Sequence, residues 1–223
     1  MYKYHLIELS NILDNSIHLV EQSYTLWEKT YSEILSHSNE TLNPDAFWRS
    51  KTLAVIEKEN QVVGLHLYNS FDLRIKSINK HSYFSHIDPE KVEEIKSNRI
   101  NSLMSCEFLT VHPNHRGKKI QISMAEVIVG LCSKVLTHSP WDALIGISRV
   151  DFKVDKMSAK IGANSFGDTK RHNIDCKLVL ARKDQIKKIE HKETLVLVEN
   201  LWSQKNNLTN LILNEISTQK GAA

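Results

Sequence analysis

The segment Cys106–Leu136 constrains the fold of this chain more than any other part of the sequence. Its first residues, CEFLTV, are mostly apolar or β-branched and alternate in the manner of a β-strand. His112-Pro113 ends that strand, because proline donates no ladder hydrogen bond and restricts the residue before it. From Ile120 onward, apolar residues recur at helical spacing. The segment is therefore predicted to form a strand, a basic turn and an amphipathic helix.

The turn between this strand and this helix has the composition of an anion-binding site. A helix begins with unpaired N–H groups and a dipole that favours negative charge. Arg116, Lys118 and Lys119 add positive charge at that point, and Gly117 lets the backbone approach a ligand closely. Asn114 is predicted to cap the helix. A basic surface turn without a ligand is the alternative, and the flanking strand and helix favour the anion site.

The same residues resemble the pyrophosphate loop of the GCN5-related N-acetyltransferase (GNAT) superfamily. In that family a strand ending in Val-x-Pro is followed by Arg/Gln-x-x-Gly-x-Gly/Ala and an amphipathic helix. Val111, Pro113 and Arg116 match, whereas Lys119 and Gln121 stand at two positions that are usually small. In the family, those small residues let the main chain close on the pyrophosphate of coenzyme A. Their replacement implies a looser grip on the pyrophosphate or a different acyl carrier.

The resemblance implies an α+β fold in α/β/α layers, with a mixed, mostly antiparallel sheet whose fourth and fifth strands splay apart. In this fold a thioester donor enters the splay, and main-chain groups of the fourth strand pair with its pantetheine arm. The implied co-substrate is acetyl-CoA or another acyl-CoA, without a metal. The residues assigned to the donor are Leu109, Thr110, Val111, Arg116, Gly117, Lys118, Lys119, Ile120, Gln121 and Asp151.

Acyl transfer to an amine needs a base for the amine, polarisation of the carbonyl and a proton for the leaving thiolate. Glu107 is the candidate base, because a carboxylate on a central strand is costly to bury unless it is paired or functional. Many family members carry a glutamate at or near this place. An outward-facing glutamate bonded to a lysine is the alternative. The family's proton-donating tyrosine falls on Ser158, which relays protons only weakly, and its asparagine after the fifth strand falls on Asp151.

Three further side chains near the loop have ordinary structural interpretations. Cys106 is conceivable as an acyl-accepting nucleophile, but a small buried hydrophobic residue is the more common role. His112 and His115 border the loop, where histidines shape the turn or contact phosphate more often than they act as bases. None of the 11 histidines forms an HxxxH pair on a predicted helix, so no metal site is predicted.

The other predicted elements complete a β-α-β-β-β-α-β-α-β-β order over residues 2–183. The first strand is expected over Tyr2–Leu9, and one long amphipathic helix or a helix pair over Ile12–His37. Its aromatic residues Trp27 and Tyr31, with Phe47 and Trp48, are candidates for a pocket, and core packing is their more common role. The remaining elements are a helical turn at Asn43–Trp48, strands at Thr52–Glu57 and Val62–Tyr68, a strand at Ala143–Val150, a helix at Phe152–Ile161 ended by Gly162, and strands at Asn164–Arg171 and Asn173–Arg182.

An insertion over Asn69–Asn101 separates the third strand from the fourth, where the family usually has a short connection. It contains a predicted helix from Asp88 to Arg99, with Pro89 at the first helical position. Long insertions are commonly lids, binding loops or partner surfaces, so this one is expected to cover the acceptor side. A solvated decoration without function is an equally common outcome.

The chain is accordingly divided into two parts. Residues 1–183, including the insertion 69–101, are predicted to form the GNAT-like acyltransferase domain. Residues 184–223 are predicted to form an extension with a helix at Thr194–Gln204 and a weakly structured tail from Asn206. The helix is expected to pack on the domain or on a neighbouring subunit.

The composition is that of a globular protein, with 41% hydrophobic and 25% charged residues. A net charge of +3 is too small to indicate nucleic acid as a partner. The three cysteines form no CxxC pair, which predicts a reducing compartment and no zinc site. The sequence shows no long apolar run at its start or elsewhere, so a cytoplasmic protein without a membrane partner is expected.

These observations and the resemblance predict an acyl-CoA-dependent N-acyltransferase of EC class 2.3.1. It would move an acyl group, acetyl by default, to an amine by direct attack. One alternative is an amino-acid N-acyl synthase that uses a longer acyl-CoA or an acyl carrier protein. Another is a catalytically inactive GNAT-like module that binds a ligand or partner. The expected partner is a small-molecule or peptide amine, and an acyl carrier protein and a homodimer stay open.

Overall fold

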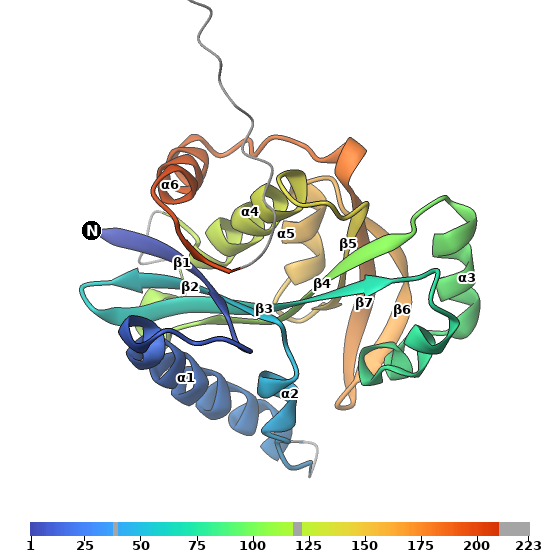
Figure 1. Ribbon diagram of the computed structural model, residues 1–223, viewed down its shortest axis with the longest axis horizontal. Coiled ribbons are helices and arrows are strands. Elements are labelled where there is room, and N and C mark those ends of the chain that lie inside the picture. The colour runs from blue at the N-terminus through green and yellow to red at the C-terminus, as the bar shows by residue number, and fades with distance from the viewer. Residues whose placement is uncertain (38–39, 118–121, 210–223) are drawn as a thin grey trace, which may run out of the picture.

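The computed structural model describes residues 1–37, 40–117 and 122–209. This part of the chain contains one eight-stranded sheet in the order β6-β7-β5-β4-β3-β2-β1-β8, with helices on both faces (Figure 1). The pairs β4–β5 and β1–β8 are parallel, and the other neighbours are antiparallel. The predicted α+β fold, in α/β/α layers around a mixed and mostly antiparallel sheet, is confirmed.

The strands are β1 (Tyr2–Glu8), β2 (Thr52–Lys58), β3 (Gln61–Asp72), β4 (Ser102–Val111), β5 (Ala143–Arg149), β6 (Asn164–Arg171), β7 (Ile174–Arg182) and β8 (Asn206–Leu208). The α-helices are α1 (Ile17–Ser36), α2 (Asp45–Trp48), α3 (Pro89–Ser97), α4 (Met124–Thr137), α5 (Val154–Lys160) and α6 (Lys192–Ser203). Short 3-10 turns are η1 (Asp14–Ser16), η2 (Lys76–Lys80), η3 (Ser82–His86), η4 (Pro113–His115) and η5 (Lys183–Gln185).

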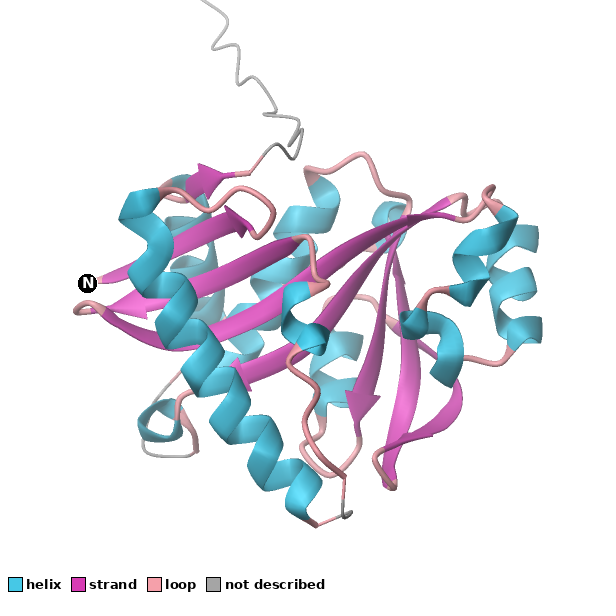
Figure 2. Ribbon diagram, turned by 60° about the horizontal axis from the view of Figure 1, so that its bottom comes forward, coloured by secondary structure: helices cyan, strands magenta, loops and turns pink. Residues whose placement is uncertain are grey.

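The two faces of the sheet are covered differently. On one face, α4, α5 and α6 lie together (Figure 1), over a core that includes Met104, Leu131 and Val198. On the other face, α1 and α2 cover a core around Trp27, and the insertion with α3 covers a separate core around Ile95 (Figure 2). The second face therefore has a seam between two apolar clusters, and the middle of β4 runs along it.

Most predicted elements are present, with shifted ends. β3 continues to Asp72, so the insertion begins later than expected. Asp88 caps α3, because its carboxylate accepts a hydrogen bond from the N–H of Glu90. The cap predicted for the central helix is wrong, since Asn114 lies in η4 and the α4 cap is Ser123. The predicted helix start at Ile120 lies outside the described residues.

Residues 192–208 pack on the sheet. α6 contributes Leu201 and Trp202 to the same core as α4. Residues 206–208 form β8, which pairs in parallel with β1, so the predicted weakly structured tail is wrong over these residues. Residues 210–223 lie outside the described part of the chain. The division of the chain at residue 183 stays a prediction.

Gly162 ends α5 at the position predicted from the sequence. Its φ is +93°, and an added Cβ would lie 2.4 Å from the main-chain oxygen of Gln185. We expect Gly162→Ala to lower the free energy of unfolding by about 2–4 kcal/mol, because it adds a backbone clash to an unfavourable φ. Urea denaturation measures this loss. Gly117→Ala is the matched control, since Gly117 has φ +87° and no atom of a described residue lies within 4 Å of the added Cβ. Equal losses in both variants would contradict the clash.

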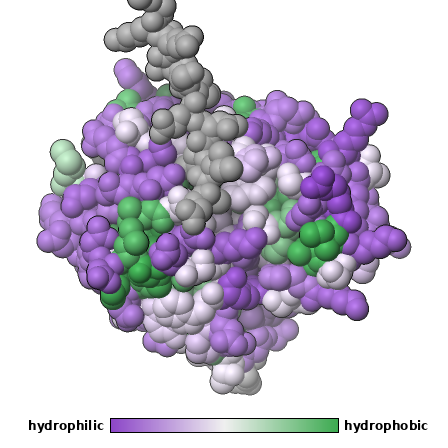
Figure 3. Space-filling view, viewed as in Figure 1, coloured by the Kyte–Doolittle hydropathy of each residue, from purple (hydrophilic) through white to green (hydrophobic). Residues whose placement is uncertain are grey.

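Within residues 1–37, 40–117 and 122–209, no helix combines the length and the apolar character needed to cross a bilayer. From the side of Figure 1 the surface is mostly hydrophilic, and its apolar residues gather in small, separate patches (Figure 3). Single exposed apolar side chains such as Phe152 and Ile75 are ordinary for a globular protein.

Candidate active site

The fourth and fifth strands part in the middle of the sheet. β4 and β5 pair only where Leu103–Ser105 faces Ala143–Ile145. Beyond these residues, β4 is paired with β3 alone and β5 with β7 alone. Figure 2 shows the strands of this region fanning apart. The predicted splay is therefore confirmed, and the main chain of Leu109–Val111 borders it.

A β-bulge in β4 shapes the inner edge of the splay. Opposite His66 of β3, two residues of β4 replace one, and the register shifts there. Phe108 has φ +56°, and its carbonyl accepts a hydrogen bond of 2.8 Å from the Thr110 hydroxyl. A bulge bends a strand and redirects its side chains. Glu107 and Phe108 consequently both lie toward the α1 face, although adjacent residues of a regular strand alternate.

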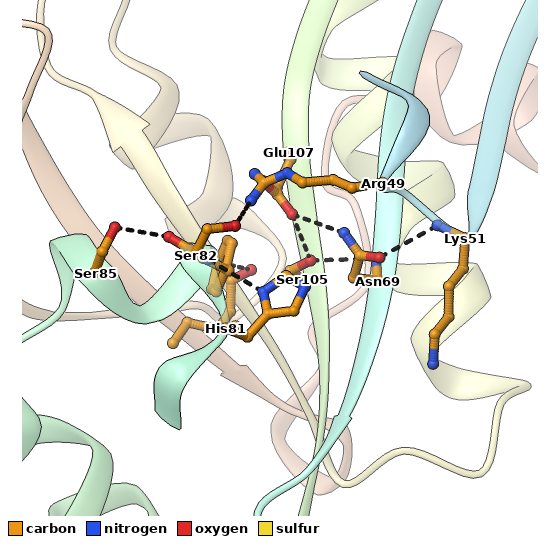
Figure 4. Close-up of polar contacts among 10 residues, drawn as sticks. Arg49, Lys51, Asn69, His81, Ser82, Ser85, Ser105 and Glu107 are labelled. Atoms are coloured by element: carbon orange, nitrogen blue, oxygen red, sulfur yellow. Dashed lines mark hydrogen bonds and ion pairs between the residues drawn. The ribbon is translucent and has the colours of Figure 1, made fainter. Parts of the chain in front are cut away.

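The carboxylate of Glu107 is buried and held by three hydrogen-bond donors (Figure 4). Its Oε2 accepts from Arg49 Nη2 at 2.8 Å, and its Oε1 accepts from Asn69 Nδ2 and Ser105 Oγ, each at 3.0 Å. The Glu107 side chain is 1% exposed and that of Arg49 is 21% exposed. The alternative of an outward glutamate bonded to lysine does not describe this residue. The Glu107 carboxylate is therefore held in one position at the seam, between α2 and the insertion.

The groups around Glu107 are themselves oriented by further contacts. The backbone N–H of Lys51 donates to Asn69 Oδ1 at 3.2 Å, which turns the amide nitrogen of Asn69 toward Glu107 (Figure 4). Arg49 Nη1 also donates to the hydroxyl of Ser82 in η3. The insertion therefore contributes directly to the surroundings of Glu107, on the face where it was expected to cover the acceptor.

Tyr83, from the same insertion, lies where the two strands part. Its hydroxyl donates to the main-chain oxygen of Ile145, the last β5 residue paired with β4, at 3.3 Å. Burial raises the pKa of Tyr83, and the negative charge of Glu107 acts in the same direction. The phenol therefore keeps its proton at neutral pH. Neither Tyr83 nor Arg49 was predicted from the sequence. The aromatic pair Tyr83-Phe84 within a polar insertion is the sequence feature that could have identified Tyr83.

Aromatic rings line the α1 side of the bulge. The ring centroids of Tyr31 and Phe108 are 4.9 Å apart at an interplanar angle of 90°. Burial raises the pKa of Tyr31 to about 12, although the positive charges of Arg171 and Arg149 oppose the shift. Trp27 is fully buried behind these rings, which is the core role expected for it.

The loop after β4 is only partly described, because residues 118–121 lie outside the described chain. Arg116 folds back on the protein: its Nε donates to the Val111 oxygen at 2.5 Å and its Nη2 to the Thr30 hydroxyl at 3.3 Å. His112 caps η4, and burial lowers the pKa of His112 and of His115. The His112 imidazole thus shapes the turn, whereas the role of His115 and that of the loop in anion binding stay predictions.

Ser158 and Asp151 lie apart from Glu107. Ser158 is buried in α5, on the face that carries α4, and no hydrogen bond between described residues joins it to Glu107. Asp151 accepts two hydrogen bonds from Arg149, at 3.0 and 2.5 Å, and these hold the pKa of its carboxyl below the usual value. The proton relay through Ser158 and the donor contact of Asp151 stay predictions.

Cys106 belongs to the opposite face of β4, against Cys132 of α4, with their sulfur atoms 3.4 Å apart. The hydrogen bond to Cys132, together with burial, raises the pKa of the Cys106 thiol. A protonated thiol is a weak nucleophile, which favours the structural interpretation of Cys106. In the described part of the chain, no group of three or more His, Cys, Asp or Glu side chains is arranged to hold a metal ion.

No known protein family and no curated protein matches this chain by sequence. Among solved structures, it is similar to the CoA-dependent acyl-homoserine lactone synthase BjaI in complex with SAM and isopentyl-CoA, with a TM-score of 0.56, 13% identity and 93% of both chains covered. The N-acyl amino acid synthase FeeM from uncultured soil microbes superposes with a TM-score of 0.58 and 7% identity, over 90% of this chain and 97% of that one. The chain has the GNAT fold.

An agmatine N-acetyltransferase variant in its apo form has the same fold, with a TM-score of 0.54 and 9% identity over 81% of this chain and 99% of that one. These identities are low, so the likeness shows the fold alone. The GNAT fold accounts for the splay between β4 and β5. It does not assign the donor or the acceptor, because one fold carries many different sites on its variable segments.

Proposed function

We propose that this GNAT-fold chain is an N-acyltransferase that moves an acyl group from an acyl-CoA to an amine by direct attack. The observation that carries the proposal is the buried, hydrogen-bonded carboxylate of Glu107 at the edge of the splay. A thioester in that splay would present its carbonyl carbon next to β4. A carboxylate fixed there supplies a proton acceptor without further reorganisation.

In the proposed reaction, Glu107 accepts a proton from the acceptor amine, directly or through one water. The amine nitrogen attacks the thioester carbonyl, the new C–N bond forms, and the C–S bond breaks to release the CoA thiolate. Tyr83 is better placed than Ser158 to return a proton to that thiolate, because its phenol lies at the parting of β4 and β5. Leu109–Val111 would pair with the pantetheine arm, and Arg116–Gln121 would receive the phosphates.

Acetyl-CoA is the default donor, and a longer acyl-CoA or an acyl carrier protein is the second candidate. The large residues Lys119 and Gln121 in the loop favour the second candidate. The likeness to a synthase solved with isopentyl-CoA and to an N-acyl amino acid synthase agrees with it. The replacements Ser158 and Asp151 favour an inactive binding module, whereas the organised surroundings of Glu107 oppose it. A cytoplasmic location and a homodimer belong to the proposal as well.

Thermal-shift titration of the full chain with acetyl-CoA and octanoyl-CoA tests the donor site. A ligand at 100 times its Kd should add about 2.7 kcal/mol of stability. Arg116→Ala should weaken this binding about 10-fold, because one charge-assisted contact is lost. Thr30→Val is the matched control, since it removes a hydroxyl that Arg116 contacts and keeps the charge.

Mass spectrometry after incubation with mixed amines then separates a transferase from an inactive module. An acylated amine that depends on the acyl-CoA is the expected product. Stabilisation by acyl-CoA without any product would support the inactive module instead. If no acyl-CoA stabilises the protein, the proposed function is wrong.

A further inference from the structure

The tip of the β6–β7 hairpin brings an arginine without an anionic partner to the candidate site. The Cζ of Arg171 lies 5.1 Å from the centroid of the Phe108 ring. Its Nε is buried and has no hydrogen-bond partner, and none of the described residues forms an ion pair with its guanidinium. A buried N–H donor left unpaired costs free energy, and a ligand that accepts a hydrogen bond from it would recover that cost.

Several charged groups around the site have partners within the protein, and the Lys51 Nζ donates to the oxygens of Ser70. Arg49 pairs with Glu107, Arg149 with Asp151, and His172 with Glu40. On the hairpin itself, Lys170 pairs with Asp175. Unlike Arg49 and Arg149, Arg171 therefore has no ion pair among the described residues. Arg171 contacts the ring of Phe108, the residue that follows Glu107, which brings the cation to the same part of β4 as the carboxylate.

The hairpin is held in place over the seam. The Thr169 hydroxyl donates to the main-chain oxygen of His86 in η3 at 2.9 Å, and the ring of His172 pairs with Glu40, beyond the end of α1. Arg171 lies between these two attachments. Phe108 directly follows Glu107 in the bulge. Its ring makes a cation–π contact with the guanidinium of Arg171. The cation is thus positioned by contacts on both sides of the seam.

We propose that the acceptor is an amine that carries a carboxylate, of which the amino acids are the simplest class, and that Arg171 binds this carboxylate. The proposal rests on the N-acyltransferase function proposed above. A guanidinium fork matches a planar carboxylate with two parallel hydrogen bonds, and the amine of the same molecule is drawn to the Glu107 carboxylate. A polyamine would instead bring a second cation to Arg171, where like charges repel.

The test compares acceptors that differ only in the carboxylate. The full-length protein is incubated with octanoyl-CoA and acetyl-CoA and with leucine, phenylalanine or serine, or with the corresponding amino-acid amides. Thiol release and product mass measure kcat/KM. We expect kcat/KM for the amino acids to be about 10- to 100-fold higher than for their amides, because the amides lack the charge-assisted hydrogen bond to Arg171. Amidation leaves more of the amine unprotonated, so intrinsic reactivity works against this result.

Arg171→Gln should abolish the preference by raising KM for the amino acids about 10- to 100-fold, with kcat/KM for the amides changed little. Arg171→Lys should retain part of the preference, because the charge stays while the fork is lost. Arg182→Gln is the matched control, since Arg182 ends β7 and pairs with Asp184 away from the seam. The proposal would be overturned if the protein acylated amides or polyamines as well as amino acids. It would also be overturned if Arg171→Gln lowered kcat/KM equally for amino acids and amides. A clear preference for O-phosphoethanolamine would overturn it in favour of a phosphate.

A binding measurement separates this proposal from the function on which it rests. Calorimetric titration of the same amino acids and amides into the protein reports carboxylate recognition without turnover. If no acceptor is acylated but amino acids bind and Arg171→Gln removes that binding, the transferase function fails and the carboxylate site stands. If amines without a carboxylate are acylated and amino acids neither react nor bind, the transferase function stands and the carboxylate site fails.

Discussion

Glu107→Gln should lower kcat about 10²- to 10⁴-fold, the range by which a positioned general base accelerates a reaction. Glutamine is nearly isosteric and keeps an acceptor oxygen for Asn69 and Ser105, so the acceptor and donor sites should keep their shape. KM for both substrates should change little. Steady-state kinetics with a saturating acyl-CoA measures the effect, and denaturation of the same sample checks that the variant is folded.

A second buried carboxylate provides the matched control for this variant. Glu57 on β2 accepts hydrogen bonds from Lys3 at 3.3 Å and from His5 Nε2 at 2.9 Å, away from the splay. Glu57→Gln should reduce stability while leaving the kcat of the folded protein unchanged. If Glu107→Gln and Glu57→Gln lose stability alike and neither loses kcat, Glu107 is a structural anion and its assignment as the base is wrong.

Arg49→Met should destabilise the protein by about 3–5 kcal/mol, because it leaves the Glu107 carboxylate buried without its ionic partner. The loss should exceed that of Glu107→Gln, since Arg49 is 21% exposed and can reach water when Glu107 is replaced, whereas the Glu107 side chain is 1% exposed. Urea denaturation at neutral pH measures both. The double variant Arg49→Met/Glu107→Gln should be more stable than Arg49→Met alone.

The wild-type protein, the two single variants and the double variant Arg49→Met/Glu107→Gln form a double-mutant cycle. A coupling of about 0.5–3 kcal/mol between the two positions is expected for residues in direct contact. Additive losses would mean that the 2.8 Å contact between Arg49 and Glu107 contributes nothing to stability. Ser82→Ala is a suitable third variant, because it removes only the hydroxyl that the insertion offers to Arg49.

The strand, turn and helix of the central unit followed from local features of the sequence, and the splay was implied by the resemblance of that unit to the GNAT loop. The strand that ends at Val111, the proline after it and the apolar spacing of the following helix identified the central unit. Predictions from local sequence were wrong where contacts between distant segments decide the structure. Asn114 has a good capping side chain, yet the chain forms η4 there, and Ser123 supplies the cap of α4. The segment at 206–208 has little strand character of its own and became β8 because β1 offered an unpaired edge.

The sequence by itself placed Glu107 on a strand, because strand and helix periodicity, proline and glycine act over a few residues, and its resemblance to the GNAT loop implied the fold class and the central position of that strand. Only the tertiary structure decided which groups surround that carboxylate. Arg49 follows α2, Tyr83 belongs to the insertion and Arg171 to the last hairpin, and they meet at the bulge of β4. Their meeting depends on the packing of two separate apolar clusters on one face of the sheet, and no local pattern in a single sequence encodes contacts of that range.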